Sequence, residues 1–350
     1  KERGLPSFRA KQIFDWLHAK QAVSFEEMTN LPETFRKELK ENYVTGRLRI
    51  RRRLTSALDG TVKYLLSLGD GNFVESVLMK YKYGYSVCIS SQAGCRMGCK
   101  FCASSDIPFS RNLSSGEILG QIIAINRYRG IRIGHVVIMG IGEPLDNYDN
   151  IVAFLRRVSS ADCLDISCRK ISLSTCGVVP GIYRLAEEGL PVTLSVSLHN
   201  PFECQRSDIM PINKKYTLDN LFEACKIYIE KTGRRITFEY AMISGVNDSA
   251  EHARELSRRL CGMLCHVNLI PVNAVSGKSF SRSPRKHIER FVSILEHFSV
   301  SVTVRRELGR DIGAACGQLR KQIMSEGADP ENFTCSEKNE DGKIAVERYL

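Results

Sequence analysis

Apolar residues recur along most of the chain in two alternating patterns. Seven apolar runs rich in β-forming residues lie at 86–90, 135–139, 170–174, 192–198, 236–242, 266–271 and 302–306. Between them, stretches such as 114–128, 216–231 and 284–298 carry apolar residues at helical spacing. Strand alternating with helix predicts parallel βα units, and therefore an α/β fold. Six or seven such units are too few for a complete eightfold barrel, so we expect an open or partial barrel of the (βα)6 type.

The first part of the chain follows other patterns. Residues 8–20 and 31–43 show helical spacing, whereas 47–80 predicts strands separated by the turn signals LDG and GDG. We therefore expect an N-terminal helical accessory domain over 1–45 and a small β extension over 46–84. The α/β core is expected over 85–322. Residues 323–350 are polar, which predicts a flexible tail.

Charge adds a candidate surface without deciding its role. The 350-residue chain has 50 Lys plus Arg against 39 Asp plus Glu, a net charge of +11. Part of the excess is local, because the segment 46–54 reads GRLRIRRRL. This segment is either a strand with solvated basic flanks or a phosphate-binding surface, and charge alone does not separate the two. Since no apolar run approaches a membrane span and no signal-peptide pattern opens the chain, we expect a cytoplasmic protein.

The chain contains 13 cysteines, a high count for such a protein. Without a secretory signal, a disulfide framework is not expected. Metal ligands or catalytic thiols account better for some of these residues, and buried small hydrophobic side chains for the rest.

Three cysteines stand in one short loop directly after the first strand of the core. Cys95, Cys99 and Cys102 have the spacing C-x3-C-x2-C. Three thiolates on one loop can hold three corners of a cubane iron–sulfur cluster and leave the fourth iron open for an exchangeable ligand. We expect Phe101 to shield such a cluster from water. The alternatives are a structural zinc site, for which a fourth ligand at suitable spacing is missing, and chance clustering of buried cysteines.

This spacing, with an aromatic residue before the last cysteine, is similar to the signature of the radical S-adenosylmethionine (SAM) superfamily. Longer segments resemble the RlmN family, over about residues 5 to 320. They are FRAKQIFDW, VCISSQAGCRMGCKFC, IMGIGEPLDN, SLHNPFECQRSDIMPINKKY and RDIGAACGQLR. The resemblance implies a radical SAM barrel with one 4Fe-4S cluster per chain, held by the three cysteines and SAM. It also implies an enzyme that methylates C2 of a specific adenosine in 23S rRNA, and in tRNA.

The resemblance further implies roles for three reacting groups. Cys316 would be methylated by one SAM molecule, and a second SAM would allow that carbon to be attached to the base. Glu75 would accept the C2 proton, and Cys88 would attack the Cys316 sulfur, which releases the methylated base and leaves a disulfide bond. The residues alone leave other interpretations open. Cys88 would ordinarily be a core cysteine on a buried strand, and Glu75 a solvated residue of a hairpin.

A SAM pocket is expected at the carboxyl ends of the strands. Glycine at 142 lets the backbone approach a ligand, and the carboxylate of Glu143 can hold the methionine ammonium group. Taken alone, GEP is also an ordinary βα turn, and His199 a satisfied structural histidine. The eight cysteines that are neither in this loop nor proposed to react are interpreted as structural: Cys163, Cys168, Cys176, Cys204, Cys225, Cys261, Cys265 and Cys335. The expected cofactor-binding residues are Gly142, Glu143, Ser174, Ser197, Leu198, His199 and Asn273.

Two other functions compete with this one. A Cfr-type enzyme would methylate C8 of the same adenine, and a non-enzymatic RNA-binding protein would use its cysteines for a structural metal. The expected partners are 23S rRNA before or during ribosome assembly, tRNA, and an electron donor such as flavodoxin, with the protein itself a monomer. RNA would be held by residues 1–45, the segment 46–54 and loops at the barrel mouth. Chemistry on one base also requires its removal from the stack.

Overall fold

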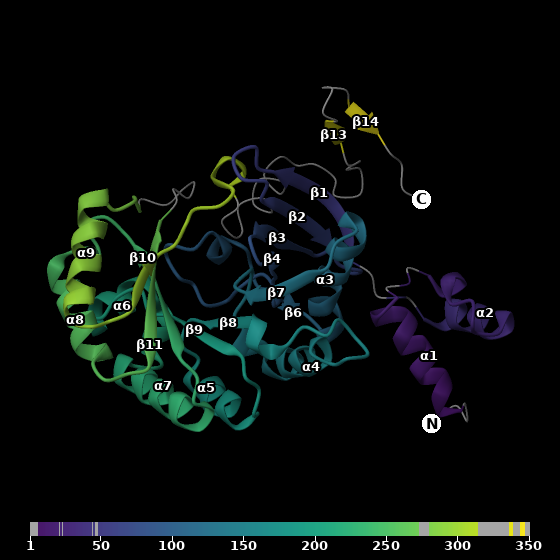
Figure 1. Cartoon of the computed structure of the whole chain (residues 1–350), viewed down its shortest axis with the longest axis horizontal. Coiled ribbons are helices and arrows are strands. Elements are labelled where there is room, and N and C mark those ends of the chain that lie inside the picture. Colours follow the sequence, from purple (N-terminus) through teal and green to yellow (C-terminus); the bar gives the residue numbers. More distant parts are fainter. Residues whose placement is uncertain are drawn as a thin grey trace.

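The computed structural model describes residues 6–20, 22, 24–43, 45, 48–272, 280–313, 336–338 and 344–346. At its centre lies one 10-stranded sheet in the order β1-β2-β3-β4-β7-β8-β9-β10-β11-β12 (Figure 1). Its strands are β1 (Arg49–Thr55), β2 (Val62–Ser67), β3 (Phe73–Tyr81), β4 (Gly84–Cys88), β7 (Ile133–Ile138), β8 (Ile171–Thr175), β9 (Thr193–Ser197), β10 (Ile236–Met242), β11 (Cys265–Pro271) and β12 (Val302–Val304).

The sheet changes character at β4. From β1 to β4 neighbouring strands are antiparallel, and each is joined to the next by a tight turn. From β4 to β12 all neighbours are parallel, which requires a crossover between successive strands. The hairpins of residues 47–80 and the βα units that follow are therefore one continuous sheet.

Helices make these crossovers, and Figure 1 shows them along one side of the curved parallel sheet. Short 3₁₀ turns also occur, among them η2 (Ala103–Asp106), η3 (Pro144–Asn147), η4 (Cys168–Lys170), η5 (Pro211–Lys214) and η6 (Arg310–Ile312). The helices are α3 (Ser115–Arg129), α4 (Tyr148–Val158), α5 (Val179–Glu187), α6 (Glu203–Ile209), α7 (Leu218–Thr232), α8 (Ala250–Leu260) and α9 (Arg285–His297).

Local sequence explains where the longer helices begin and end. The Ser114 hydroxyl accepts a hydrogen bond from the backbone N–H of Glu117, and the Glu117 carboxylate accepts one from the backbone N–H of Ser114, so α3 starts with a capping box. Gly130 ends α3 with φ of 60°, and Gly233 ends α7 with φ of 62°. Glycine adopts this left-handed conformation without strain, which stops each helix at a defined residue.

The N-terminal helices have a small core of their own. They are α1 (Ser7–His18) and α2 (Glu33–Asn42), joined through η1 (Phe25–Glu27). An ion pair of 3.5 Å between Glu27 and Arg127 connects them to α3. Their buried apolar residues are Ala22, Phe25, Met28, Leu31 and Leu39.

The predicted fold class is confirmed. The described residues form a mixed α/β fold with seven parallel strands, and the two ends of the strand order, β1 and β12, leave the sheet open. The proposed division into domains at 45, 84 and 322 stays a prediction. Of the expected tail, the structure describes only β13 (Ser336–Lys338) and β14 (Ile344–Val346), an antiparallel pair. No helix in the described ranges has both the length and the apolar character needed to span a membrane.

Candidate active site

The three closely spaced cysteines lie on the loop that follows the first parallel strand, β4. Two short strands, β5 (Gln92–Ala93) and β6 (Arg111–Asn112), pair with each other and close this loop at its base. Cys95, Cys99 and Cys102 are each half-buried along it. The structure therefore brings the three thiols together at the carboxyl end of the parallel sheet. We call residues 94–110 the cysteine loop.

Burial disfavours ionisation of two of these thiols, those of Cys95 and Cys99. It raises the pKa of Cys95 to about 11 and raises the pKa of Cys99 more strongly, and Cys102 adds to both shifts. A cationic group that binds all three would stabilise them as thiolates. Within the described ranges, no three Cys, His, Asp or Glu side chains are close enough together to hold a single metal ion. A cubane takes one thiolate per iron, and the cysteine loop offers three thiols within one short segment, which is the donor set that such a cluster uses.

The cysteine loop closes on itself because residue 94 is a glycine. Gly94 has φ of +92°, and a Cβ atom there would lie 2.0 Å from the carbonyl oxygen of Pro108. Gly98 also has a positive φ, of +69°, but a Cβ atom there would meet only the side chain of Pro211, at 3.6 Å. Residue 94 must be glycine because the backbone of Pro108 lies too close for a Cβ atom. At residue 98, glycine is favoured only by the positive φ angle.

An apolar cluster lies against the cysteine loop. The backbone N–H of Lys100 donates to the carbonyl oxygen of Ile209 over 2.9 Å, which attaches the loop to α6. The ring of Phe101 packs here and meets His199 edge-on, with centroids 4.7 Å apart. This side of the loop is therefore apolar, as expected for Phe101. The buried members are Cys176, Ile209 and Met210, and the loop contributes Met97, Cys99 and Phe101.

A buried arginine holds two neighbouring strand ends together. Arg206 is 1% exposed, and its Nη2 donates to the carbonyl oxygens of Cys176 and Ser197, over 2.9 and 3.0 Å. Its Nε donates to the carbonyl oxygen of Leu198 over 3.0 Å, and its Nη1 to Oδ1 of Asn213 over 2.6 Å. Since these carbonyls follow β8 or end β9, one guanidinium group fixes the geometry of both.

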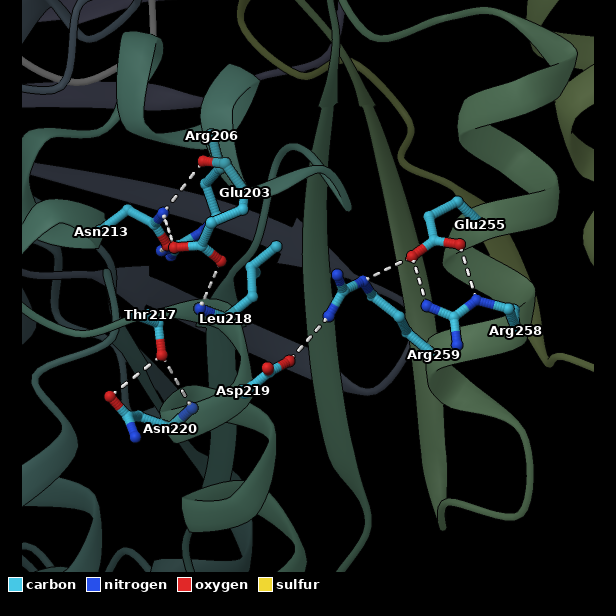
Figure 2. Close-up of polar contacts among 10 residues, drawn as sticks. All are labelled: Glu203, Arg206, Asn213, Thr217, Leu218, Asp219, Asn220, Glu255, Arg258 and Arg259. Carbon is cyan, nitrogen blue, oxygen red and sulfur yellow. Dashed lines mark hydrogen bonds and ion pairs between the residues drawn. The ribbon is translucent and has the colours of Figure 1, made fainter.

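The same arginine belongs to a polar network that sets α6 against α7. Figure 2 shows Glu203 between Asn213 and Leu218. One carboxylate oxygen of Glu203 accepts from the Asn213 amide over 2.7 Å, and the other from the backbone N–H of Leu218 over 2.9 Å. The network continues the contacts of Arg206 away from the strand ends and connects α6 to the start of α7.

The end of β7 carries the IGEP motif. Gly142 has φ of +108°, and a Cβ atom there would lie 2.6 Å from Cβ of Gln92. The side chain of Glu143 is buried, and its two oxygens accept hydrogen bonds from the backbone N–H groups of Leu145 (3.0 Å) and Cys176 (2.7 Å). Burial raises the pKa of Glu143, although these hydrogen bonds oppose the shift. The side chains of Cys176 and Thr175 also hydrogen-bond to this carboxylate, so a ligand ammonium would share its oxygens with these donors.

Gln92 connects this motif to the cysteine loop. Its Oε1 accepts from the backbone N–H of Glu143 over 2.9 Å, and its amide donates to Asn112 (2.8 Å) and Asp146 (2.7 Å). Asp146 also binds Arg96 of the cysteine loop through two hydrogen bonds, of 2.7 and 2.8 Å. The geometry of the cysteine loop is thus coupled to that of the β7 end.

The remaining predicted cofactor residues lie at the next strand ends. Ser174 lies in β8 and Ser197 ends β9, and both are half-buried. Leu198 is fully buried, and its backbone N–H donates to the carbonyl oxygen of Glu239 over 3.0 Å. Because β7, β8 and β9 are neighbours in the sheet, these residues and Gly142–Glu143 share one edge. Asn273 lies outside the described residues.

His199 occupies a special backbone position. It has φ of 57°, and its Nδ1 accepts a hydrogen bond of 2.9 Å from the backbone N–H of Ala241. An acceptor Nδ1 places the ring proton on Nε2. Burial lowers the pKa of His199 to about 3, and the nearby charge of Arg206 adds to the shift. His199 is therefore neutral, and its ring is hydrogen-bonded to the backbone just after β9. This is what the interpretation as a satisfied structural histidine expects.

Two of the three proposed reacting residues are described, and both are buried. Cys88 ends β4, where it packs against Val77. The side chain of Glu75, in β3, is 3% exposed and lies 3.1 Å from Nζ of Lys63. The alternative that Glu75 is a solvated hairpin residue is wrong, because its side chain is buried and paired with Lys63. Cys316 lies outside the described residues.

The basic segment is more integrated into the fold than its charge suggests. Arg51 donates to the hydroxyl of Ser67 over 3.0 Å, and the guanidinium carbon of Arg53 lies 5.6 Å above the ring of Tyr128. Arg49 is exposed. Arg51 and Arg53 of the edge strand β1 therefore interact within the fold. Fewer than the five arginines of the segment 46–54 are left fully available to a ligand.

The other cysteines divide by burial. None of the described cysteines forms a disulfide bond. Four of those interpreted as structural are buried in the core, which supports that interpretation. Cys204 and Cys261 are exposed, so they do not serve as core residues. Cys335 lies outside the described residues. The four buried ones are Cys163, Cys168, Cys176 and Cys225.

Three polar residues of this region are absent from the sequence-based expectation: Gln92, Arg206 and Lys63. The sequence feature that could have indicated one of them is a charged residue within an apolar stretch, as for Lys63 in TVKYLLSL. Such a residue, if buried, requires a partner. Its partner could not be named without the pairing of β2 with β3.

Comparison with protein families finds two matches. Residues 89–256 match the model of the radical SAM superfamily. Residues 1–44 match the model described as the ribosomal RNA large subunit methyltransferase N-terminal domain. The first match begins directly after β4 and contains the cysteine loop, the IGEP motif and the β9 end. The second covers the helices α1 and α2.

Individual proteins resemble nearly the whole chain. A probable dual-specificity RNA methyltransferase RlmN from Clostridium perfringens (strain SM101 / Type A) is 52% identical over 93% of this chain and 94% of its own length. A protein of the same name from Lachnoclostridium phytofermentans is 53% identical over 91% and 89%. The crystal structure of a radical SAM methyltransferase from Sphaerobacter thermophilus superposes with a TM-score of 0.87, at 42% identity over 91% and 94%.

Proposed function

Because the chain belongs to the RlmN family of radical SAM RNA methyltransferases, we propose that it methylates C2 of one adenosine in 23S rRNA, and in tRNA. Likeness to the named relatives over nine-tenths of the chain carries this proposal. The geometry supports it, since the cysteine loop, Glu143 and the ends of β8 and β9 meet at one edge of the sheet.

Members of the radical SAM family bind a 4Fe-4S cluster and SAM. We assign Cys95, Cys99 and Cys102 to the cluster and the edge formed by Gly142–Glu143, Ser174 and Ser197–His199 to SAM. When bound, the cluster supplies a single electron for the cleavage of SAM. The apolar cluster around Phe101 keeps water from that side of the loop, and Glu143 orients the ammonium group of the ligand.

C2 of adenine lies between two ring nitrogens and is too electron-poor to attack a methyl donor. The proposal therefore attaches the methyl carbon first to Cys316, whose thiol displaces it from SAM. A second SAM, once cleaved, would supply the 5′-deoxyadenosyl group that takes a hydrogen atom from this carbon, and the carbon then bonds to C2 and joins the RNA to Cys316. The adduct would give up one proton, to Glu75, and one electron, which would return to the oxidised cluster. Attack of the Cys88 thiolate on the Cys316 sulfur forms a disulfide and breaks the carbon–sulfur bond, and the freed carbon takes a proton to complete the methyl group.

The RNA partners and the remaining partners belong to the same proposal. Residues 1–45 and the exposed part of 46–54 would contact RNA phosphates, and the target base would leave its stack to reach the strand ends. A flavodoxin-like donor would supply the electron. The enzyme would act as a monomer.

Analysis of the RNA product tests the proposal. Protein reconstituted with iron and sulfide without oxygen is incubated with SAM, a reductant, and 23S rRNA or tRNA, and the digested nucleosides are identified by mass spectrometry. We expect 2-methyladenosine. A product of 8-methyladenosine would overturn the C2 assignment in favour of a Cfr-type reaction. RNA without new methyl groups, from protein that binds zinc in place of iron, would overturn the enzymatic proposal.

One variant tests the covalent route, and a second serves as its matched control. Cys316→Ala is expected to bind the cluster and cleave SAM but to make no methylated RNA. Cys261→Ala removes an exposed thiol elsewhere and is expected to be fully active. Methylated RNA from the Cys316 variant would contradict the S-methylcysteine intermediate.

A further inference from the structure

Lys63 is a charged side chain inside a buried strand. β2 is buried along its whole length, and the Lys63 side chain is 0% exposed. A buried ammonium group is tolerated only where it meets acceptors. Its Nζ lies 3.1 Å from Oε2 of Glu75 and donates to the carbonyl oxygen of Gly313 over 2.8 Å. One ammonium group thus joins a carboxylate of the sheet to a segment 250 positions away.

Strand pairing places Lys63, Glu75 and Cys88 on one face of the sheet. Lys63 is paired with Val77, and Val77 is paired with Cys88. Directly paired residues share a face, and so do residues two apart along a strand. Glu75 stands two positions before Val77. The two described reacting residues and the lysine therefore project from the same face.

The segment 308–313 lies against that face. Leu308 packs on the cluster formed by Val77, Met79 and Cys88. Gly313, at the other end of the segment, accepts the hydrogen bond from Lys63. In the sequence, Gly313 precedes Cys316 by three positions. Lys63 thus contacts both Glu75 and the chain that leads to the thiol proposed to carry the methyl group.

The turn between β1 and β2 attaches the same segment from its other side. The hydroxyl of Ser56 donates to Oδ1 of Asp311 over 2.6 Å, and the backbone N–H of Ala57 donates to Oδ2 over 2.8 Å. Asp59 accepts from the backbone N–H of Gly309 over 2.8 Å. These contacts fix residues 309–311 independently of Lys63, so loss of the lysine would not release the whole segment.

We propose that Lys63 is a positioning residue for the last stage of methyl transfer. It holds the Glu75 carboxylate on the face that carries Cys88 and at a set place relative to the segment that ends at Gly313. The inference rests on the proposed function, because only that function gives Glu75 a proton to accept. In this proposal Lys63 itself exchanges neither the proton nor the methyl carbon, and it acts through Glu75.

The proposal distinguishes early steps from late ones. Methylation of Cys316 and cleavage of SAM do not involve Glu75, whereas resolution of the RNA adduct does. Loss of a correctly placed base lowers the rate of a proton-transfer step by about 100-fold or more. Without Lys63, the RNA adduct should therefore form and persist. A lysine that served only the fold would affect all steps alike.

The test compares Lys63→Met with Glu75→Gln, and Lys80→Met is the matched control. Lys80 is an exposed lysine on β3, so its replacement removes the same charge from the surface. Each holoenzyme is assayed for iron content, 5′-deoxyadenosine formation, methylation of Cys316 by mass spectrometry, methylated RNA, and protein–RNA adduct on denaturing gels. The double variant Lys63→Met/Glu75→Gln removes both buried charges together and keeps the comparison possible if the single variant folds poorly.

We expect Lys63→Met and the double variant to form 5′-deoxyadenosine and methylated Cys316 within about threefold of the unaltered enzyme, and to lose methylated RNA by about 10-fold or more. Adduct should accumulate in both variants, as in Glu75→Gln. Lys80→Met should match the unaltered enzyme. Equal losses in every assay, or full methylation by Lys63→Met, would overturn the positioning role. Failure of the proposed function would differ, since the unaltered enzyme would then make no 2-methyladenosine.

Discussion

The carboxylate of Glu143 accepts a hydrogen bond of 2.7 Å from the backbone N–H of Cys176, which ties the end of β7 to the loop after β8. Its other oxygen accepts one of 3.0 Å from the backbone N–H of Leu145. The side chain that was expected to hold a ligand ammonium thus also satisfies two buried donors. Its position is set by the fold before any ligand binds, which is the preorganisation that a cofactor site requires.

Replacement of Glu143 by alanine should affect both stability and SAM binding. It leaves two buried N–H groups without an acceptor, which should lower the free energy of unfolding by about 2–5 kcal/mol. It also removes the proposed partner of the ammonium group, so SAM affinity should fall about 10-fold or more. Urea denaturation measures the first effect, and equilibrium dialysis of reconstituted protein with SAM measures the second.

Asp149→Ala is the matched control for Glu143→Ala. The Asp149 side chain is 88% exposed, at the start of α4, so its loss should change neither quantity measurably. If folded Glu143→Ala bound SAM as tightly as the control, Glu143 would not contact the ligand.

Two glycines of the cysteine loop should respond differently to alanine. Gly98→Ala should cost about 1–2 kcal/mol for the left-handed conformation and still bind iron. Gly94→Ala adds a clash with the backbone of Pro108, 2.0 Å away, so the cysteine loop must open. We expect the Gly94 variant to lose most of its iron after anaerobic reconstitution. Equal iron content in the two variants would mean that closure of the cysteine loop is not needed for the cluster.

The sequence predicted the parallel strands well because their signal is local. Runs such as 170–174 and 236–242 carry apolar, β-forming residues within short segments, and β8 and β10 lie there. The cysteine loop was found for a similar reason, since all three thiols lie in one short segment. Elements and motifs of this kind need no knowledge of distant contacts.

The environment of Glu75 could not be predicted in the same way. Its partner Lys63 is found by the register of β2 with β3, and the segment 308–313, far away in the sequence, lies against the same face. The contacts of Arg206 with carbonyls of β8 and β9 are likewise set by the crossovers between strands. Both residues are charged, and a sequence pattern alone assigns charged residues to the surface.

Replacement by methionine should destabilise the protein at Arg206 but not at Arg258; both residues are drawn in Figure 2. Loss of the Arg206 guanidinium would leave the carbonyls of Cys176, Ser197 and Leu198 without their donor. We expect the free energy of unfolding to fall by at least about 3 kcal/mol. Arg258 pairs with Glu255 at 2.7 Å on the surface, with 69% of its side chain exposed, so its loss should have no measurable effect.

Urea denaturation of the cluster-free proteins compares the two arginine variants. An Arg206 variant as stable as the Arg258 variant would show that the strand-end carbonyls find other donors. It would also mean that the link between the ends of β8 and β9 does not depend on the guanidinium group of Arg206.

The last prediction concerns acid stability. Because burial and Arg206 lower the pKa of His199 to about 3 from 6.5, the unfolded chain takes up a proton below pH 6.5 that the folded protein does not. Stability from the neutral ring is therefore complete above pH 6.5 and declines as the pH falls toward 3. His199→Asn keeps an acceptor for Ala241 and tolerates the positive φ, but it does not titrate. The difference in unfolding free energy between unaltered protein and this variant should fall by about 2 kcal/mol from pH 7 to pH 5. Urea titrations at several pH values measure this difference. If it did not change with pH, His199 would take up its proton in the folded state as readily as in the unfolded chain.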